Sequence, residues 1–367
     1  MIRRITFDEF FAMRDAVPAA DVRAPAEFRQ GHLSGAYSLP LFTDDERARV
    51  GTAYKKQGKE AAVLLGFEIT GPKWTGFIHE ATRIAPGKKI ALHCWRGGMR
   101  SSAMAWALDL YGFEVCLLQG GYKAYRRWVF RQFEKELSLL VLGGMTGSGK
   151  TRMLQQLDSM GEQVIDLEEL AQHQGSSYGT LGRMIQPTQE QFENELAAVL
   201  FRLDHGKRTW IEDESQNIGR CLIPKPLWLR MRDALLFDVR VPLEQRVDAL
   251  VEEYGSLDKD FLVECTERIH KRLGPEQTTH AIAAIRDHRM DDFIRIVLIY
   301  YDKTYRKGLS CREAARILPV TVTGDDPAEN ARRLLAEAEA ISSDSAQPIS
   351  SNTPQSVSPN PRQPIPS

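Results

Sequence analysis

The chain has 367 residues, of which 43% are hydrophobic and 26% are charged, and its formal net charge is −1 at pH 7. This ordinary globular composition indicates no special class, and the length allows two domains with separate cores. The near-zero charge excludes a generally basic surface, so a nucleic acid would have to bind to a local basic face.

The cysteines and the apolar runs indicate the compartment. The N-terminus, "MIRRITFDEFFAM", lacks the apolar core of a signal peptide, and no apolar run approaches the ~20 residues that cross a bilayer. Five cysteines are scattered and never spaced as Cys-x-x-Cys, which predicts neither a disulfide framework nor a zinc site. We expect a cytoplasmic protein with no membrane partner.

The first 134 residues alternate short apolar runs with helical patterns. The runs "DAVPAADVR", "KIALHC" and "EVCLLQGG" have the composition of buried strands. Such alternation is typical of α/β domains with parallel strands. We therefore predict a small α/β domain with a parallel sheet over residues 1–134.

A glycine-rich loop lies in this domain, within "LHCWRGGMRSSA" (92–103), between a predicted strand and a helix predicted over 101–110. Gly97 and Gly98 allow successive backbone N–H groups to converge on one point. The helix N-terminus adds positive potential at the same place. The loop is therefore suited to a tetrahedral anion.

The same loop contains a candidate nucleophile, Cys94. Two arginines, Arg96 and Arg100, and the helix N-terminus should lower the pKa of its thiol below the ~8.5 of a free cysteine. The alternative is a buried structural cysteine beside surface arginines. That alternative is disfavoured because a buried apolar thiol needs neither two glycines nor two guanidinium groups around it.

The second unit opens with "LSLLVLGGMTGSGKT" (137–151), where an apolar strand leads through a glycine loop into a helix. The loop matches G-x-x-x-x-G-K-[ST], whose amides wrap a diphosphate while the lysine reaches the terminal phosphate and the hydroxyl can bind Mg²⁺. A glycine-rich turn that only caps a helix is the alternative. The predicted phosphate-binding residues are Gly144, Gly147, Gly149, Lys150 and Thr151. We assign residues 137–342 to this P-loop NTPase-like α/β domain.

Three other segments complete the second unit. "RTWIEDES" (208–215) ends a strand with Glu212 and Asp213, either of which could be the acidic partner of the phosphate loop or simply part of a solvated strand end. "HQGSSYGTLG" (173–182) has the composition of a substrate loop or of an ordinary connection. Residues 343–367 are rich in Ser, Pro, Asn and Gln, which predicts a disordered C-terminal tail.

The motifs of the first domain resemble those of rhodaneses. "DVRAPAEFRQGHLSGAYSLPL" (21–41) and "GGYKAYRRW" (120–128) flank Cys94 as in that fold, although "HCWRGGMRS" also fits the loop of cysteine phosphatases. Over about residues 5–330 the chain resembles the bacterial tRNA 2-selenouridine synthases. The motifs that carry this resemblance are, in order, "CWRGGMRS", "GGMTGSGKT", "HQGSSYG", "QEQFENEL" and "IEDESQNIG".

The resemblance implies a reaction and its substrates. The family replaces the sulfur of wobble 2-thiouridine with selenium, through an S-geranylated intermediate made from geranyl diphosphate, with selenophosphate as the selenium donor. By motif match, Cys94 would carry selenium, Arg96 and Arg100 would hold the anion, and the P-loop would bind the diphosphate. Gln174 departs from the pattern, because an arginine is common there. No tightly bound cofactor is implied, and we expect a monomer.

A tRNA partner requires a basic surface. "YKAYRRWVFRQF" (122–133) joins positive charge to aromatic rings that could stack on an unpaired base, and "ERIHKRL" (267–273) is second in line. The alternative is a solvated helix face whose aromatic residues belong to a core between the domains. The predicted tRNA contacts are Lys123, Arg126, Arg127 and Arg131. Because the linker from 128 to 137 is short, we expect the two anion sites to share a groove.

Two other functions are compatible with the motifs. One is a cysteine-dependent phosphatase or sulfurtransferase fused to a P-loop nucleotide kinase. The other is a regulatory module that senses a nucleotide and docks a partner. A phosphatase needs an acid for its leaving group, which the sequence near the loop does not offer. A pure binding module does not need a nucleophilic thiol.

Overall fold

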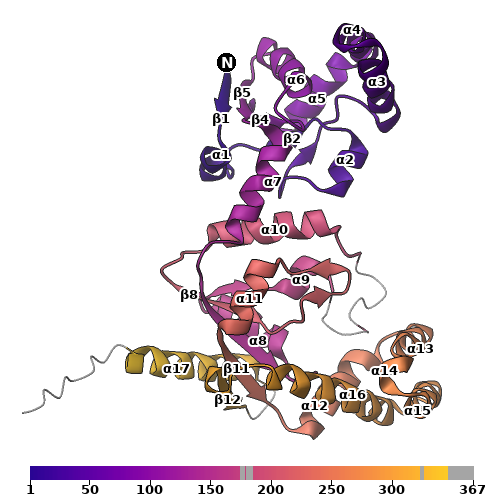
Figure 1. The fold of residues 1–367 in the computed structure, drawn as a ribbon, viewed down its shortest axis with the longest axis vertical. Coiled ribbons are helices and arrows are strands. Elements are labelled where there is room, and N and C mark those ends of the chain that lie inside the picture. The colour runs from indigo at the N-terminus through magenta and orange to yellow at the C-terminus, as the bar shows by residue number, and fades with distance from the viewer. Residues whose placement is uncertain (174–177, 179–184, 323–325, 346–367) are drawn as a thin grey trace, which may run out of the picture.

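The computed structural model describes residues 1–173, 178, 185–322 and 326–345 (Figure 1). Gln174, most of the segment 173–182 and residues 346–367 of the predicted tail lie outside the described residues. The first domain lies at the top of Figure 1 and the second below it, with one helix of the second domain between the two sheets.

The first domain is built on a five-stranded parallel sheet in the order β1-β5-β4-β2-β3, as its alternating pattern predicts. The central strand β4 is buried along most of its length, which explains its apolar composition. Its strands are β1 (Ile2–Ile5), β2 (Ala19–Asp21), β3 (Tyr37–Ser38), β4 (Lys89–His93) and β5 (Glu114–Leu118). Its helices are α1 (Phe7–Met13), α2 (Pro25–Gln30), α3 (Asp44–Gln57), α4 (Lys59–Thr70), α5 (Trp74–Ile84), α6 (Met99–Leu110) and α7 (Gly121–Gln132).

The second domain has a parallel sheet of its own, in the order β12-β11-β6-β8-β7. The P-loop follows β6, at the centre of this sheet, and leads into α8. Its strands are β6 (Ser138–Gly144), β7 (Gln163–Ile165), β8 (Arg208–Glu212), β11 (Leu235–Arg240) and β12 (Ile317–Thr321), and β9 (Asn217–Ile218) pairs with β10 (Cys221–Leu222) in a hairpin.

Ten α-helices belong to the described part of this domain. Five of them, α12 to α16, pack around a core of their own that includes Val247, Leu262 and Phe293. The helices are α8 (Lys150–Ser159), α9 (Leu167–Ala171), α10 (Gln189–Arg202), α11 (Lys225–Asp233), α12 (Leu243–Gly255), α13 (Lys259–Arg268), α14 (His270–Leu273), α15 (Pro275–Arg286), α16 (Met290–Ser310) and α17 (Pro327–Ser345). Among the described helices none is long and apolar enough to span a bilayer.

One hydrophobic core runs across the domain junction. The ring of Trp128 on α7 stacks on Phe11 with centroids 4.4 Å apart, and it contacts Phe201 of α10 at 5.2 Å. Trp128 is 1% exposed, and its indole N–H donates to Asp8 at 2.9 Å. Four of the five aromatic residues of the segment 122–133 are therefore core residues, as in the alternative to a base-stacking surface, whereas Phe130 is 50% exposed.

Candidate active site

The candidate nucleophile lies where β4 ends and α6 begins, at the carboxyl edge of the first sheet. We call residues 94–98 the Cys94 loop. The Gly98 N–H and the Ser101 hydroxyl each donate to Cys94 Sγ at 3.3 Å. Cys94 is only 3% exposed, so its sulfur is surrounded by these donors rather than by water. The Gly98 N–H thus points at the sulfur, and the helix expected after the loop begins at Met99.

This environment favours the thiolate form of Cys94. Burial by itself raises the pKa of the thiol. The hydrogen bonds from Ser101 and from the backbone at Arg96, together with the charge of Arg100, outweigh burial and hold the pKa below its ordinary value. The prediction of a lowered pKa is therefore supported by specific donors.

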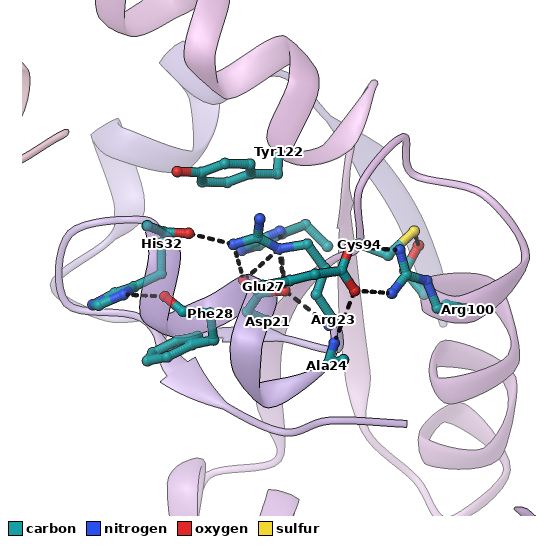
Figure 2. A network of polar contacts seen from close by, with 12 residues as sticks. Asp21, Arg23, Ala24, Glu27, Phe28, His32, Cys94, Arg100 and Tyr122 are labelled. Atoms are coloured by element: carbon teal, nitrogen blue, oxygen red, sulfur yellow. Dashed lines mark hydrogen bonds and ion pairs between the residues drawn. The ribbon is translucent and has the colours of Figure 1, made fainter. Parts of the chain in front are cut away.

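The two arginines that follow Cys94 have different surroundings, and Figure 2 shows those of Arg100, which belongs to α6. Arg100 forms an ion pair with Glu27 of α2, with Nη1 2.6 Å from Oε2. Arg96 is exposed and makes no side-chain hydrogen bond to the described residues. The sequence reading missed Glu27, although it stands in the "DVRAPAEF" motif. Arg100 is therefore held in place, whereas Arg96 is free to meet an anion.

A second ion pair lies beneath the loop. Arg23 donates to Asp21 Oδ2 at 2.6 Å and to the Gly31 carbonyl at 2.6 Å, and all of these groups are buried. The guanidinium lies 3.6 Å from the ring centroid of Tyr122 on α7. His93 is also fully buried, and burial lowers its pKa, so it is neutral at pH 7.

Helix α10 of the second domain contacts this layer directly. The Tyr122 hydroxyl donates to Glu190 Oε1 at 2.7 Å and accepts from Asn194 Nδ2 at 2.9 Å. Asn194 also donates to the His32 carbonyl at 2.8 Å. The "QEQFENEL" motif is thus a contact between the domains.

The structure places the four predicted tRNA contacts in two different environments, one at the domain interface and one on an exposed helix face. Arg126 forms an ion pair with Glu193 and donates to Asn194 Oδ1 at 2.5 Å. This pairing neutralises Arg126 within the domain interface, so its surroundings are those of a structural residue rather than of a phosphate contact. The other three, at four-residue intervals on the exposed face of α7, are Lys123, Arg127 and Arg131.

The P-loop, residues 144–149, has the strand–loop–helix context that its motif requires. Lys150 begins α8, and its ammonium donates to the Gly144 carbonyl at 2.9 Å. Gly147 has φ +81°, and a Cβ there would lie 2.9 Å from the Arg246 carbonyl, so only glycine fits. Arg246 in turn donates to the Thr146 carbonyl at 3.0 Å and pairs with Asp302 at 2.7 Å. The loop is therefore braced from α12 and α16.

Glu212 and Asp213, the two candidate acidic partners of the P-loop, have different surroundings. Asp213 accepts from Arg312 at 2.7 Å, so it belongs to an ion pair. Glu212 is fully buried, and its Oε1 accepts the Glu168 N–H at 2.7 Å, while Oε2 is buried with no hydrogen-bond partner among the described residues. Of the pair, Glu212 is the one that lies beside Glu168 and Glu214, near Thr151 of the P-loop motif.

A further carboxylate, Glu168 of α9, was missed by the sequence reading. It accepts from the Thr151 hydroxyl at 3.3 Å and shares a hydrogen bond with Glu214. Burial raises the pKa of Glu168 against the opposing charge of Lys150, and burial and Glu168 together raise those of Glu212 and Glu214. The signal for Glu168 was its place just after a strand, in "VIDLEEL".

Comparisons with known proteins bear on both halves of the chain. The family profile described as "tRNA 2-selenouridine synthase AAA domain" matches residues 137–326, and the profile of the rhodanese-like domain matches residues 6–127. A solved structure of the N-terminal domain of a protein from Clostridium difficile 630 covers 34% of this chain and 97% of its own, at 37% identity and a TM-score of 0.33.

Curated relatives named tRNA 2-selenouridine synthase match most of the chain. The relative from Nitrosomonas europaea is 40% identical over 65% of this chain and 63% of its own length, and that from Bdellovibrio bacteriovorus is 42% identical over 65% and 64%. The matched parts thus span slightly less than two thirds of these two relatives. The relative from Hydrogenovibrio crunogenus is 37% identical over 79% of this chain and 88% of its own length. The chain belongs to the tRNA 2-selenouridine synthase family.

Proposed function

We propose that this protein is a tRNA-modifying enzyme that converts wobble 2-thiouridine to 2-selenouridine through an S-geranylated intermediate. The observation that carries the proposal is the pairing, in one chain of this family, of an activated thiol in an anion loop with a P-loop braced for a diphosphate. Each loop suits one of the two anionic substrates, selenophosphate and geranyl diphosphate.

The P-loop is the proposed site of geranylation. Its backbone N–H groups would hold the diphosphate of geranyl diphosphate. The sulfur of 2-thiouridine attacks the allylic carbon, a carbon–sulfur bond forms, and the carbon–oxygen bond breaks with its electron pair leaving on the diphosphate. Lys150, at the start of α8, would neutralise the charge that grows there.

Magnesium fits the residues near the P-loop in the way it is usually bound, by one or two protein oxygens together with substrate phosphates. Thr151, Glu168 and the unpartnered Oε2 of Glu212 supply such oxygens. Among the described residues no group of three or more His, Cys, Asp or Glu side chains could hold a metal by itself. When bound, the ion would add positive charge beside the diphosphate.

The Cys94 loop is the proposed site of selenation. Its N–H groups, with Arg96 and Arg100, would hold selenophosphate. The Cys94 thiolate would attack C2 of the geranylated base, and the geranyl thiolate would leave with its electron pair. The selenium of selenophosphate would then attack C2 and displace the Cys94 thiolate, and water would cleave the selenium–phosphorus bond to release phosphate. Alkylation turns the sulfur of the base into a thioether, which leaves from C2 with the electron pair more readily than an unalkylated sulfur. Trp95, 40% exposed and 5.9 Å from the Tyr122 ring, lies where it could stack on an unpaired base.

The exposed face of α7 is the proposed contact to tRNA. Lys123, Arg127 and Arg131 point away from the joint core and are not paired with carboxylates in the described structure. Their helix begins at the Cys94 loop, because the Tyr122 N–H donates to the Cys94 carbonyl at 2.8 Å. Phosphate contacts there would bring the anticodon arm to the thiol.

The main alternative is a cysteine-dependent phosphatase or sulfurtransferase fused to a nucleotide kinase. A phosphatase needs an uncommitted acid near its thiol. The carboxyl groups of Glu27 and Asp21, which lie beside Cys94 in Figure 2, are each paired with an arginine. Hydrogen bonds and neighbouring positive charge hold the pKa of each carboxyl low against the effect of burial. The geometry therefore favours group transfer over phosphate-ester hydrolysis.

Mass analysis of tRNA nucleosides tests the proposal. Cells that carry the gene should contain 2-selenouridine, and cells without it should retain 2-thiouridine. The purified protein with tRNA, geranyl diphosphate and selenophosphate should form S-geranyl-2-thiouridine and then 2-selenouridine. Unchanged tRNA in both experiments would contradict the proposal.

A further inference from the structure

Helix α7 begins directly against the Cys94 loop. The Tyr122 N–H donates to the Cys94 carbonyl at 2.8 Å, and the Lys123 N–H donates to the Trp95 carbonyl at 2.9 Å. A Cβ on Gly121 would lie 2.3 Å from the Cys94 carbonyl oxygen and 2.4 Å from the Gly97 nitrogen. The two segments are packed so closely that a shift at the start of α7 must move the Cys94 loop.

The side chain of Tyr122 extends from that point to the second domain. The residue is fully buried, and its ring covers Arg23 at 3.6 Å and faces the ring of His93 at 6.2 Å. Burial raises the pKa of Tyr122, so its hydroxyl keeps its proton and donates. That hydroxyl contacts Glu190 and Asn194, both on α10.

The packing around this hydroxyl is as tight as that around the loop. A Cβ on Gly31 would lie 2.7 Å from the Tyr122 hydroxyl oxygen and 2.8 Å from Glu190 Cγ. The Gly31 carbonyl also accepts from Arg23 at 2.6 Å. Three chain segments thus meet at one point, and α10 supplies both hydrogen-bond partners of the tyrosine.

We propose that Glu190 and Asn194 of the second domain are positioning residues for Cys94, and that they act through Tyr122 to hold the Cys94 loop in its anion-binding shape. The proposal rests on the proposed function for the role of Cys94. If Tyr122 loses its partners, α7 is free to shift, the carbonyls of Cys94 and Trp95 lose their donors, and the N–H and hydroxyl groups around Sγ lose their alignment. The second domain then completes the thiol site of the first domain as well as carrying the P-loop site.

The test measures the pH profile of iodoacetamide alkylation of Cys94 in the full chain, with peptide mass mapping to separate it from the other cysteines. We expect Glu190→Leu to move the midpoint to higher pH and to slow alkylation below the midpoint by about threefold to tenfold, because fewer thiols are ionised. Tyr122→Phe keeps the ring over Arg23 and should act in the same direction. Tyr122→Phe is the test variant if Glu190→Leu does not fold.

Glu193→Leu is the matched control. Glu193 lies on the same helix and also crosses the interface, but its side chain accepts hydrogen bonds from Arg126 and Gln189 and makes none with Tyr122 among the described residues. We expect it to lower the melting temperature and leave the alkylation profile unchanged. A wild-type profile in folded Glu190→Leu or Tyr122→Phe, or an equal shift in Glu193→Leu, would overturn the proposal. Alkylation needs no tRNA or selenium, so failure of the proposed function leaves this result intact.

Discussion

The two anion loops of this protein share one local design and differ in their electrostatics. Each follows a central strand of a parallel sheet and precedes a helix. Around the Cys94 loop, donors and arginine lower the pKa of a thiol, whereas around the P-loop, burial and neighbouring charge raise the pKa of carboxylates. The local fold thus provides an anion site, and side chains from distant segments decide its chemistry.

Those distant side chains also differ in origin. The Cys94 loop depends on α2 for Glu27 and, through Tyr122, on α10 of the other domain. The P-loop depends on its own domain, with Arg246 bracing its backbone and Glu168 contacting Thr151. We therefore expect changes in the second domain to affect both sites, and changes confined to the first domain to affect mainly the thiol.

The largest expected effect separates the chemistry of the two loops. Cys94→Ser should reduce selenation by about a thousandfold or more, because the thiolate proposed to attack C2 of the base is gone. Geranylation should persist, since attack by the sulfur of tRNA on an allylic carbon needs no protein thiol. Nucleoside mass analysis measures both products. Normal formation of 2-selenouridine would remove Cys94 from the mechanism.

The converse change targets the P-loop. Lys150→Ala should slow geranylation about a hundredfold and weaken geranyl diphosphate binding, because the charge on the departing diphosphate is no longer neutralised. Alkylation of Cys94 should be unchanged, which serves as the internal control. If the variant geranylates normally but loses a tRNA-dependent ATP hydrolysis that turnover requires, the P-loop binds a nucleotide instead.

A smaller effect is expected on the face of α7. Replacing Arg127 and Arg131 together by alanine should weaken tRNA binding by about tenfold and reduce the salt slope by about 1.4 to 1.8, as for two lost phosphate contacts. Filter binding at several salt concentrations measures this, and geranyl diphosphate affinity should not change. Arg126→Ala, by contrast, should lower thermal stability. An unchanged salt slope in the double variant would direct attention to residues 267–273.

Local patterns predicted both loops, because a strand, a glycine turn and a helix start are encoded within a dozen adjacent residues. The partners of those loops could not be read in the same way. Glu27 reaches Arg100 across 73 positions, and the choice of Glu212 over Asp213 depends on Arg312, which is 99 positions away. Arg126 has the sequence context of a basic surface, yet the carboxylate that pairs with it stands 67 positions later. That the two sites share one groove stays a prediction.

The smallest expected effect concerns Glu27, whose carboxylate offsets the charge of Arg100. Glu27→Gln removes this negative charge and leaves Arg100 more positive near Cys94, so the pKa of the thiol should fall further below its ordinary value. The midpoint of the alkylation profile should move to lower pH, and the rate below the wild-type midpoint should rise about threefold. Glu46→Gln, which removes a carboxylate on α3 that pairs with Lys73, is the control and should leave the profile unchanged. A slower reaction in Glu27→Gln would mean that Glu27 acts by orienting Arg100 rather than by its charge.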